Sequence, residues 1–80
     1  MIEHNLKILP QYFEAVISGE KKFELRKNDR NFKVHDTFVL REWEPENGFT
    51  GRCYTNEISY VIKDCPEYGL IDGYAIFAWQ

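Results

Sequence analysis

The residues best suited to chemistry lie in one stretch, GEKKFELRKNDRNFK, at positions 19–33. From Lys21 to Lys33, six side chains are Lys or Arg and two are acidic, a net charge of +4 in a chain whose total is −3. The rest of the chain is therefore acidic, and a local basic stripe of this kind can concentrate an anionic ligand. The alternative is a solvated strand face, on which an exposed ion pair contributes at most about 1 kcal/mol.

Length and composition limit the classes of protein that fit. The 80 residues predict a single domain over 1–80. A domain of this size buries only about 60% of the surface of its unfolded chain, which excludes a large cleft between domains. Apolar residues are 44% and aromatic residues 16% of the chain, a composition that predicts a folded core rather than disorder. A pI near 5.3 argues against a protein that coats nucleic acid non-specifically.

Neither the cysteines nor the N-terminal residues indicate a metal site or a membrane segment. Cys53 and Cys65 form no CxxC pair and have no zinc-ligand spacing, so we expect free thiols. No apolar run approaches the roughly 20 residues of a membrane span, and the first residues lack the basic and apolar regions of a leader peptide. The sequence predicts a cytoplasmic protein with no metal, no cofactor and no membrane partner.

Apolar spacing predicts the first two elements. Residues 2–8 alternate between apolar and polar side chains, which is typical of a half-buried strand, and His4 lies on the apolar face. A hydrogen-bonded structural histidine is the expected role there. Residues 10–18 predict a short helix, with Pro10 in the first turn and Gly19 as a left-handed cap.

A further strand is predicted over 22–26, directly after the helix cap. Its alternation places Phe23 and Leu25 on one face. The opposite face carries three charged side chains, Lys22, Glu24 and Arg26. We expect both apolar residues to join the core. The helix is expected to contribute its own core residues, Phe13, Val16 and Ile17.

The second half of the chain reads mostly as strands. A strand is predicted over 36–43, and residues 49–62 predict one long or two short strands with a bend near Gly51. Residues 63–73 have the composition of a loop, and 74–79 form an apolar run that suits a strand buried on both faces. Five or six short strands with one or two short helices indicate an α+β fold, a small and partly closed β-barrel.

The segment GEKKFELR resembles the G-x-K-x-x-E-x-R signature of ASCH domains, members of the PUA-like superfamily, through Gly19, Lys21, Glu24 and Arg26. Nearly the whole chain is similar to a small uncharacterised bacterial and phage branch of that group, through HNLKILPQYFEAVISGEKKFELRKNDRNFKV and the later LREWEP and YGLIDGY. The resemblance implies a PUA-like β-barrel with a helix beside a cleft. His35 stands where relatives in this branch have Gly, so its turn is expected to need a different backbone geometry.

The resemblance also implies binding of RNA or modified nucleosides, with Lys21, Glu24 and Arg26 facing the cleft. Lys and Arg can hold a phosphate or a base carbonyl, and a carboxylate can accept from an exocyclic amine. Arg30 would extend this contact along a nucleic-acid backbone. Bases of single-stranded RNA stack on exposed rings, for which the candidates are Trp43, Tyr54 and Tyr68. Three other cations are expected to be surface charges, Lys22, Lys27 and Lys33.

A hydrolase is the second possibility. Some ASCH-like proteins are amidohydrolases that act on acylated cytidine with a Lys, a Thr nucleophile and a distant Glu, and Lys21 matches that Lys. The Thr position is Glu24 here, which has no hydroxyl to attack an amide. Lys21 and Glu24 would have to activate water instead, and a nuclease activity is open on the same grounds.

A protein-interaction module in transcription regulation is the third possibility, because ASCH domains also occur in transcriptional coactivators. The acidic stretch REWEPE could serve a contact with a protein partner. Salt separates this possibility from RNA binding, which weakens steeply as counterion release is lost. The sequence leaves the oligomeric state open.

Overall fold

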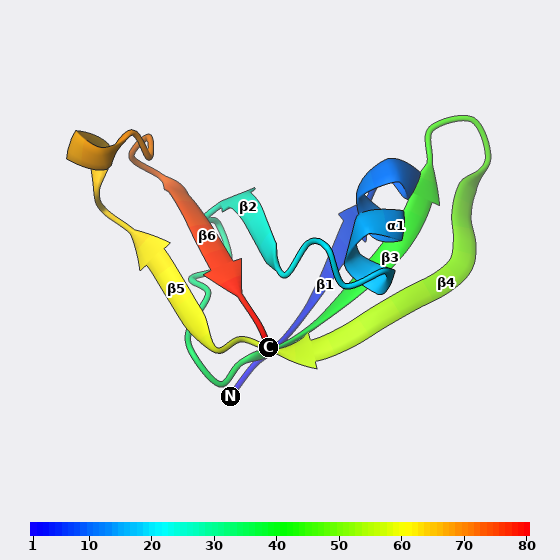
Figure 1. Cartoon of the computed structure of the whole chain (residues 1–80), viewed down its shortest axis with the longest axis horizontal. Helices are drawn as coiled ribbons and strands as arrows, with labels where there is room; N and C mark the ends of the chain where they lie inside the picture. Colours follow the sequence, from blue (N-terminus) through cyan, green and yellow to red (C-terminus); the bar gives the residue numbers. More distant parts are fainter.

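The computed structural model describes residues 1–80 and contains six strands, one α-helix and one 3-10 helix (Figure 1). The elements in chain order are β1 (Glu3–Ile8), α1 (Pro10–Ile17), β2 (Phe23–Lys27), β3 (Thr37–Glu44), β4 (Gly48–Glu57), β5 (Tyr60–Lys63), η1 (Pro66–Tyr68) and β6 (Tyr74–Ala78). The predicted α+β class and the predicted number of strands and helices are confirmed.

The helix begins and ends where the sequence signals predict. Pro10 occupies the first turn of α1, where its missing N–H costs no hydrogen bond. The chain leaves the helix through Gly19, whose φ of +84° is a left-handed conformation that glycine adopts without a steric penalty. The eight residues of α1 are far fewer than a bilayer crossing requires, and no other helix is long and apolar enough for one.

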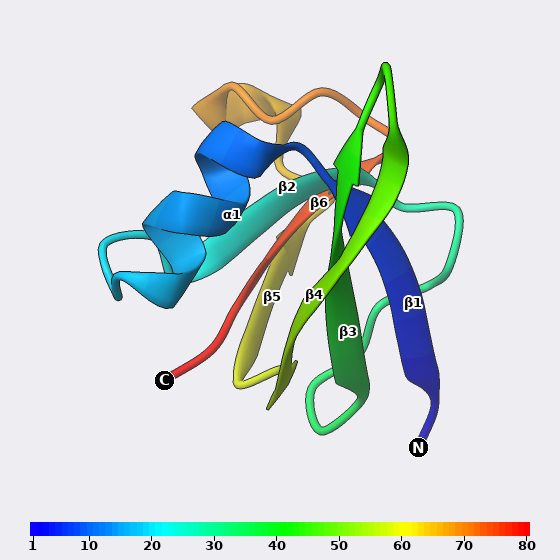
Figure 2. The ribbon, with the colours of Figure 1, turned by 90° about the vertical axis from the view of Figure 1, so that its right-hand side faces the viewer.

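The strands form two three-stranded sheets, with strand orders β1-β3-β4 and β2-β6-β5. β1 runs parallel to β3, and the other paired strands are antiparallel. The sheets diverge from the end of the molecule where both termini lie (Figure 1), and Figure 2 shows α1 beside the end of β1. β1 and β2 are both edge strands and do not pair. No closed barrel is found, so the structure confirms the α+β fold but not the partly closed barrel.

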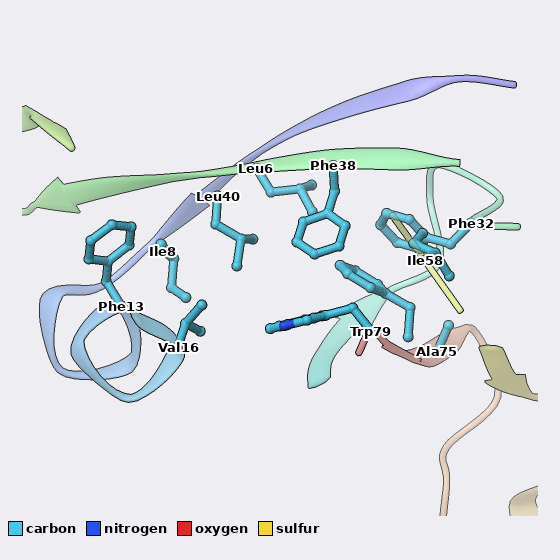
Figure 3. Packing of buried hydrophobic residues seen from close by; sticks show 11 residues of the cluster. Leu6, Ile8, Phe13, Val16, Phe32, Phe38, Leu40, Ile58, Ala75 and Trp79 are labelled. Carbon is cyan, nitrogen blue, oxygen red and sulfur yellow. The ribbon is translucent and has the colours of Figure 1, made fainter. Parts of the chain in front are cut away.

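Aromatic side chains fill the junction between the two sheets. Phe38 of β3 is fully buried, with its ring centroid 5.0 Å from that of Phe77 on β6 and 4.8 Å from that of Trp79. Figure 3 shows Phe38 and Trp79 beside aliphatic side chains that continue toward α1, those of Leu6, Leu40, Ile8 and Val16. Phe32 comes from the loop between β2 and β3. Its ring centroid lies 4.9 Å from that of Phe77. This shared core holds the two sheets together at one end.

Three residues predicted to be in the core are not buried. Phe23 and Leu25 on β2 are 47% and 56% exposed, and Ile17 is 45% exposed. The prediction for β2 was wrong because the strand turns its charged face inward: Glu24 is only 6% exposed and Arg26 is half-buried. Ile17 is the last residue of α1. The helix packs on the sheet through other side chains, among them Phe13, and Ile17 lies outside this contact.

The remaining strands follow the prediction with one change. Residues 49–57 lie in β4 and residues 60–62 in β5, and Gly51 within β4 has a φ of +95°. β6 was predicted to be buried on both faces, but only Ala75 and Phe77 are buried, while the alternate residues are half-buried or exposed. The reason is that its sheet packs on the core with one face. His35 has a φ of +77°, a left-handed backbone geometry.

Candidate functional site

The backbone after α1 brings Lys21, Glu24 and Arg26 into direct contact. Glu24 lies on the inward face of β2, and its Oε1 accepts a hydrogen bond from the Lys21 ammonium. Its Oε2 accepts one from Arg26 Nε at 2.9 Å. Lys21 Nζ also donates to the main-chain carbonyl of Phe23 at 2.8 Å. The carboxylate is therefore clamped between two cations, which compensates the cost of burying its charge.

Arg26 also connects the two sheets across their unpaired edges. Its guanidinium donates to the main-chain carbonyl of Lys7, near the end of β1. Between these two edges lies a groove of about 600 Å³. Its lining residues are Lys7, Ile8, Leu9, Tyr12, Lys21, Phe23, Glu24, Leu25, Arg26, Lys27 and Tyr74. We call this cavity the edge groove, because it occupies the gap between β1 and β2.

The edge groove is cationic. Lys7, Lys21, Arg26 and Lys27 contribute four positive charges to the lining, against the single carboxylate of Glu24. Because both Glu24 oxygens already accept hydrogen bonds from Lys21 and Arg26, the carboxylate holds these cations in place. An anionic ligand would meet an excess of positive charge.

Aromatic rings stand beside these cations. Tyr12 of α1, Phe23 of β2 and Tyr74 of β6 line the edge groove, and between 40% and 49% of each residue is exposed. The Lys21 ammonium lies 5.0 Å from the Phe23 ring centroid and 5.9 Å from that of Tyr12, within the range of cation–π attraction. Three partly exposed rings next to these cations form a surface on which a planar, charged ligand can stack.

The aromatic residues proposed from the sequence lie elsewhere. Trp43 is half-buried under the Lys7 ammonium, 4.1 Å from its ring centroid, and Tyr54 packs against Phe38 and Trp79. Tyr68 is 88% exposed in η1 but does not line the edge groove. Sequence patterns do not show which strand edges meet.

Arg30, the fourth charged residue predicted for the site, also lies outside the edge groove. It is exposed in the loop after β2, and its Nε lies 3.9 Å from Asp29 Oδ1. Lys33 is also exposed outside the edge groove, whereas Lys27, predicted as a surface charge, lines it. The alternation on β2 gave no sign of this, because Lys27 lies on the same face as Phe23, which was predicted to join the core.

The structure contains a second charged cluster that was not predicted from the sequence. The buried carboxylate of Glu42 accepts hydrogen bonds from Arg52 Nε at 2.9 Å and from Thr50 Oγ1 at 2.7 Å. The Arg52 guanidinium also contacts Glu14 on α1 and lies 4.9 Å from the Phe13 ring centroid. These bonds lower the pKa of Glu42 and raise that of Arg52. The cluster ties α1 to the first sheet.

His4 has the predicted structural role. It is buried, and its Nε2 lies 2.9 Å from Asp36 Oδ2. The Asp36 carboxylate also accepts bonds from the main-chain N–H groups of Ile2 and Lys33. Burial opposes ionisation of Asp36, but the hydrogen bonds outweigh it, so the pKa of Asp36 lies below its ordinary value of 3.8. This pair fixes the start of β1 to β3.

The fold and the edge groove thus define a small α+β domain with a cationic, aromatic groove between two sheet edges. The chain belongs to the family described as Domain of unknown function (DUF3850), whose sequence model matches residues 3–79. Over 49 residues, 61% of the chain, it is 45% identical to the "Uncharacterized 12.9 kDa protein in GpA 3'region" of Escherichia phage P2. The match spans 44% of that phage protein, less than half of its length.

Proposed function

We propose that the edge groove binds a nucleotide-like ligand, as a segment of single-stranded RNA or as a modified nucleotide. The observation that carries this proposal is the juxtaposition of Lys21 and Arg26, fixed by Glu24, with the open rings of Tyr12 and Phe23. A nucleotide combines a phosphate, which suits fixed cations, with a planar base, which stacks on aromatic rings.

The resemblance to ASCH domains supports the same proposal. Its signature residues Lys21, Glu24 and Arg26 are the ones that meet in the edge groove. A PUA-like relationship belongs to the proposal as well. The gap between β1 and β2 is where a barrel built from these two sheets would close.

Binding fits the lining of the edge groove better than hydrolysis does. The lining contains no Ser, Thr, Cys or His, the usual nucleophiles and general bases. Both oxygens of the Glu24 carboxylate already accept hydrogen bonds from cations, Lys21 and Arg26, so the carboxylate is engaged in holding these side chains. We therefore assign the edge groove a binding role.

The test is a titration of the protein with short single-stranded RNA oligomers and with nucleoside monophosphates, followed by NMR at two salt concentrations. Lys21→Ala is the informative variant and Lys33→Ala its matched control, since Lys33 is an exposed cation outside the edge groove. We expect ligand shifts at Lys21 to Lys27 that shrink with salt, and at least about tenfold weaker binding for Lys21→Ala alone.

Three outcomes would overturn this proposal. Equal weakening by Lys21→Ala and Lys33→Ala would show diffuse attraction to the basic stripe rather than a site. No shift with any nucleotide at low salt would exclude nucleotide binding and favour a protein partner. Turnover of an acylated cytidine that disappears in Lys21→Ala would replace binding by hydrolysis.

A further inference from the structure

The side of β2 that faces the edge groove is an unpaired sheet edge. β2 pairs only with β6, and the alternate residues make these bonds: Lys22 accepts from Trp79, and Asn28 donates to Gly73. In an antiparallel pair, hydrogen-bonded and non-hydrogen-bonded positions alternate. The main-chain N–H and C=O groups of Phe23, Leu25 and Lys27 therefore point away from β6.

Most of these edge groups have no partner within the chain. The Phe23 carbonyl accepts from Lys21 Nζ, which confirms that this edge faces the cations of the edge groove. No hydrogen bond occupies the N–H or C=O of Leu25, or the N–H of Lys27, and both residues line the edge groove. The open edge thus presents a donor, an acceptor and a donor in fixed order.

We propose that this open edge binds the Watson–Crick edge of a nucleobase, with the Leu25 carbonyl as acceptor and the Lys27 N–H as donor. The inference rests on the proposed nucleotide binding and specifies the ligand. The ligand is a base with a free donor beside a free acceptor, such as the amino group and ring nitrogen of adenine or cytosine.

The arrangement divides the recognition of a nucleotide between two sets of groups. Lys21 and Arg26 take the phosphate, and the rings of Tyr12 and Phe23 cover the faces of the base. The open edge of β2 binds the polar rim of the base, so a base whose rim is blocked leaves the Leu25 carbonyl and the Lys27 N–H without these partners. Glu24 is a positioning residue that holds the two cations and makes no contact with the base.

The first experiment compares ligands that differ only at the base rim. Adenosine monophosphate is titrated beside its N6,N6-dimethyl analogue, and uridine monophosphate beside its 3-methyl analogue, with the wild-type protein. We expect about tenfold weaker binding of each blocked analogue, in line with the cost of losing a bidentate base contact. The amide proton of Lys27 should shift downfield only with the unblocked nucleotides.

The second experiment removes the donor from the protein. Lys27→Pro deletes the N–H, and proline is tolerated on an edge strand where the N–H faces outward. Lys27→Ala is the matched control, because it removes the same charge and keeps the N–H. We expect Lys27→Ala to weaken all nucleotides alike, whereas Lys27→Pro, which leaves only the Leu25 carbonyl to contact the base, also reduces the preference for unblocked bases.

The outcomes separate this inference from the proposed function. Absence of binding by every nucleotide overturns both. Binding of blocked and unblocked nucleotides with equal affinity leaves nucleotide binding in place and overturns the assignment of the base to β2. If Lys27→Pro does not fold, the comparison of blocked and unblocked ligands on the wild-type protein decides the question alone.

Discussion

Arg26 on β2 donates a hydrogen bond to the main-chain carbonyl of Lys7 on β1, and so connects two sheets whose facing edges are otherwise unpaired. The same guanidinium fixes Glu24 through its Nε. Arg26 is therefore both part of the proposed site and part of the fold. A variant at Lys21, whose bonds stay within residues 21–24, tests binding with less structural disturbance.

Glu24 is expected to matter for stability. Glu24→Gln removes the charge between Lys21 and Arg26 and leaves two cations facing each other, so the free energy of unfolding should fall by about 1–3 kcal/mol. Urea denaturation measures this. Glu46→Gln is the control, because Glu46 is exposed and has no ion pair. Equal stability of the two variants would show that the Glu24 ion pairs contribute nothing.

Stability should fall in acid. The pKa values of Asp36 and Glu42 in the folded protein lie below their ordinary values of 3.8 and 4.5. The unfolded chain therefore takes up protons first as the pH decreases, and this contribution to stability, present above the ordinary values, is lost as the pH falls through the folded pKa values.

Urea unfolding at a series of pH values between about 3 and 7 tests the acid dependence. Asp36→Asn and Glu42→Gln should each flatten the decline below pH 4.5, because each removes one titrating group. A wild-type stability that stays constant down to the ordinary pKa of Asp36, 3.8, and below would contradict the prediction.

His35 offers a test of backbone strain. Its φ of +77° is unfavourable for a residue with a Cβ. His35→Gly and His35→Ala lose the same side-chain contact with Glu57, so their difference reports the backbone alone. We expect the Gly variant to be more stable than the Ala variant by about 0.5–1 kcal/mol. Thermal unfolding of the two variants measures this difference. An Ala variant at least as stable as the Gly variant would refute the prediction of backbone strain.

Phe38 should dominate the junction between the sheets. Its side chain is fully buried against Phe77 and Trp79, and Phe38→Leu leaves part of that space empty, at a cost of about 1–2 kcal/mol. Tyr68→Leu, at a residue that is 88% exposed, should change stability by less than about 0.5 kcal/mol. Guanidinium denaturation compares them. Similar losses of stability in the two variants would show that Phe38 does not dominate the junction between the sheets.

Much of the fold could be predicted from local patterns. The alternation in β1 and the signals of Pro10 and Gly19 reproduce the first strand and the helix, because they depend on neighbouring residues only. The facing of β2 could not be predicted in this way. Alternation identifies two faces, and the rule that charged faces are exposed fails where Glu24 is buried by its own ion pairs with Lys21 and Arg26.

The candidate site was predicted in part. Lys21, Glu24 and Arg26 were proposed together, and the structure brings them together. The aromatic residues were missed because Tyr12 and Tyr74 come from elements more than 50 residues from each other in the sequence. Only the meeting of α1, β2 and β6 places them in one groove.

The strand order has a consequence for how the edge groove forms during folding. β3 pairs with β4 and β5 with β6, so these pairs join strands that follow each other in the chain. The two strands that border the edge groove pair instead with distant segments, Glu3 with Thr37 and Phe23 with Ala78. Such non-local pairings form late, because loop closure must come before their contacts. We expect a nascent chain to have no edge groove until β6 has left the ribosome.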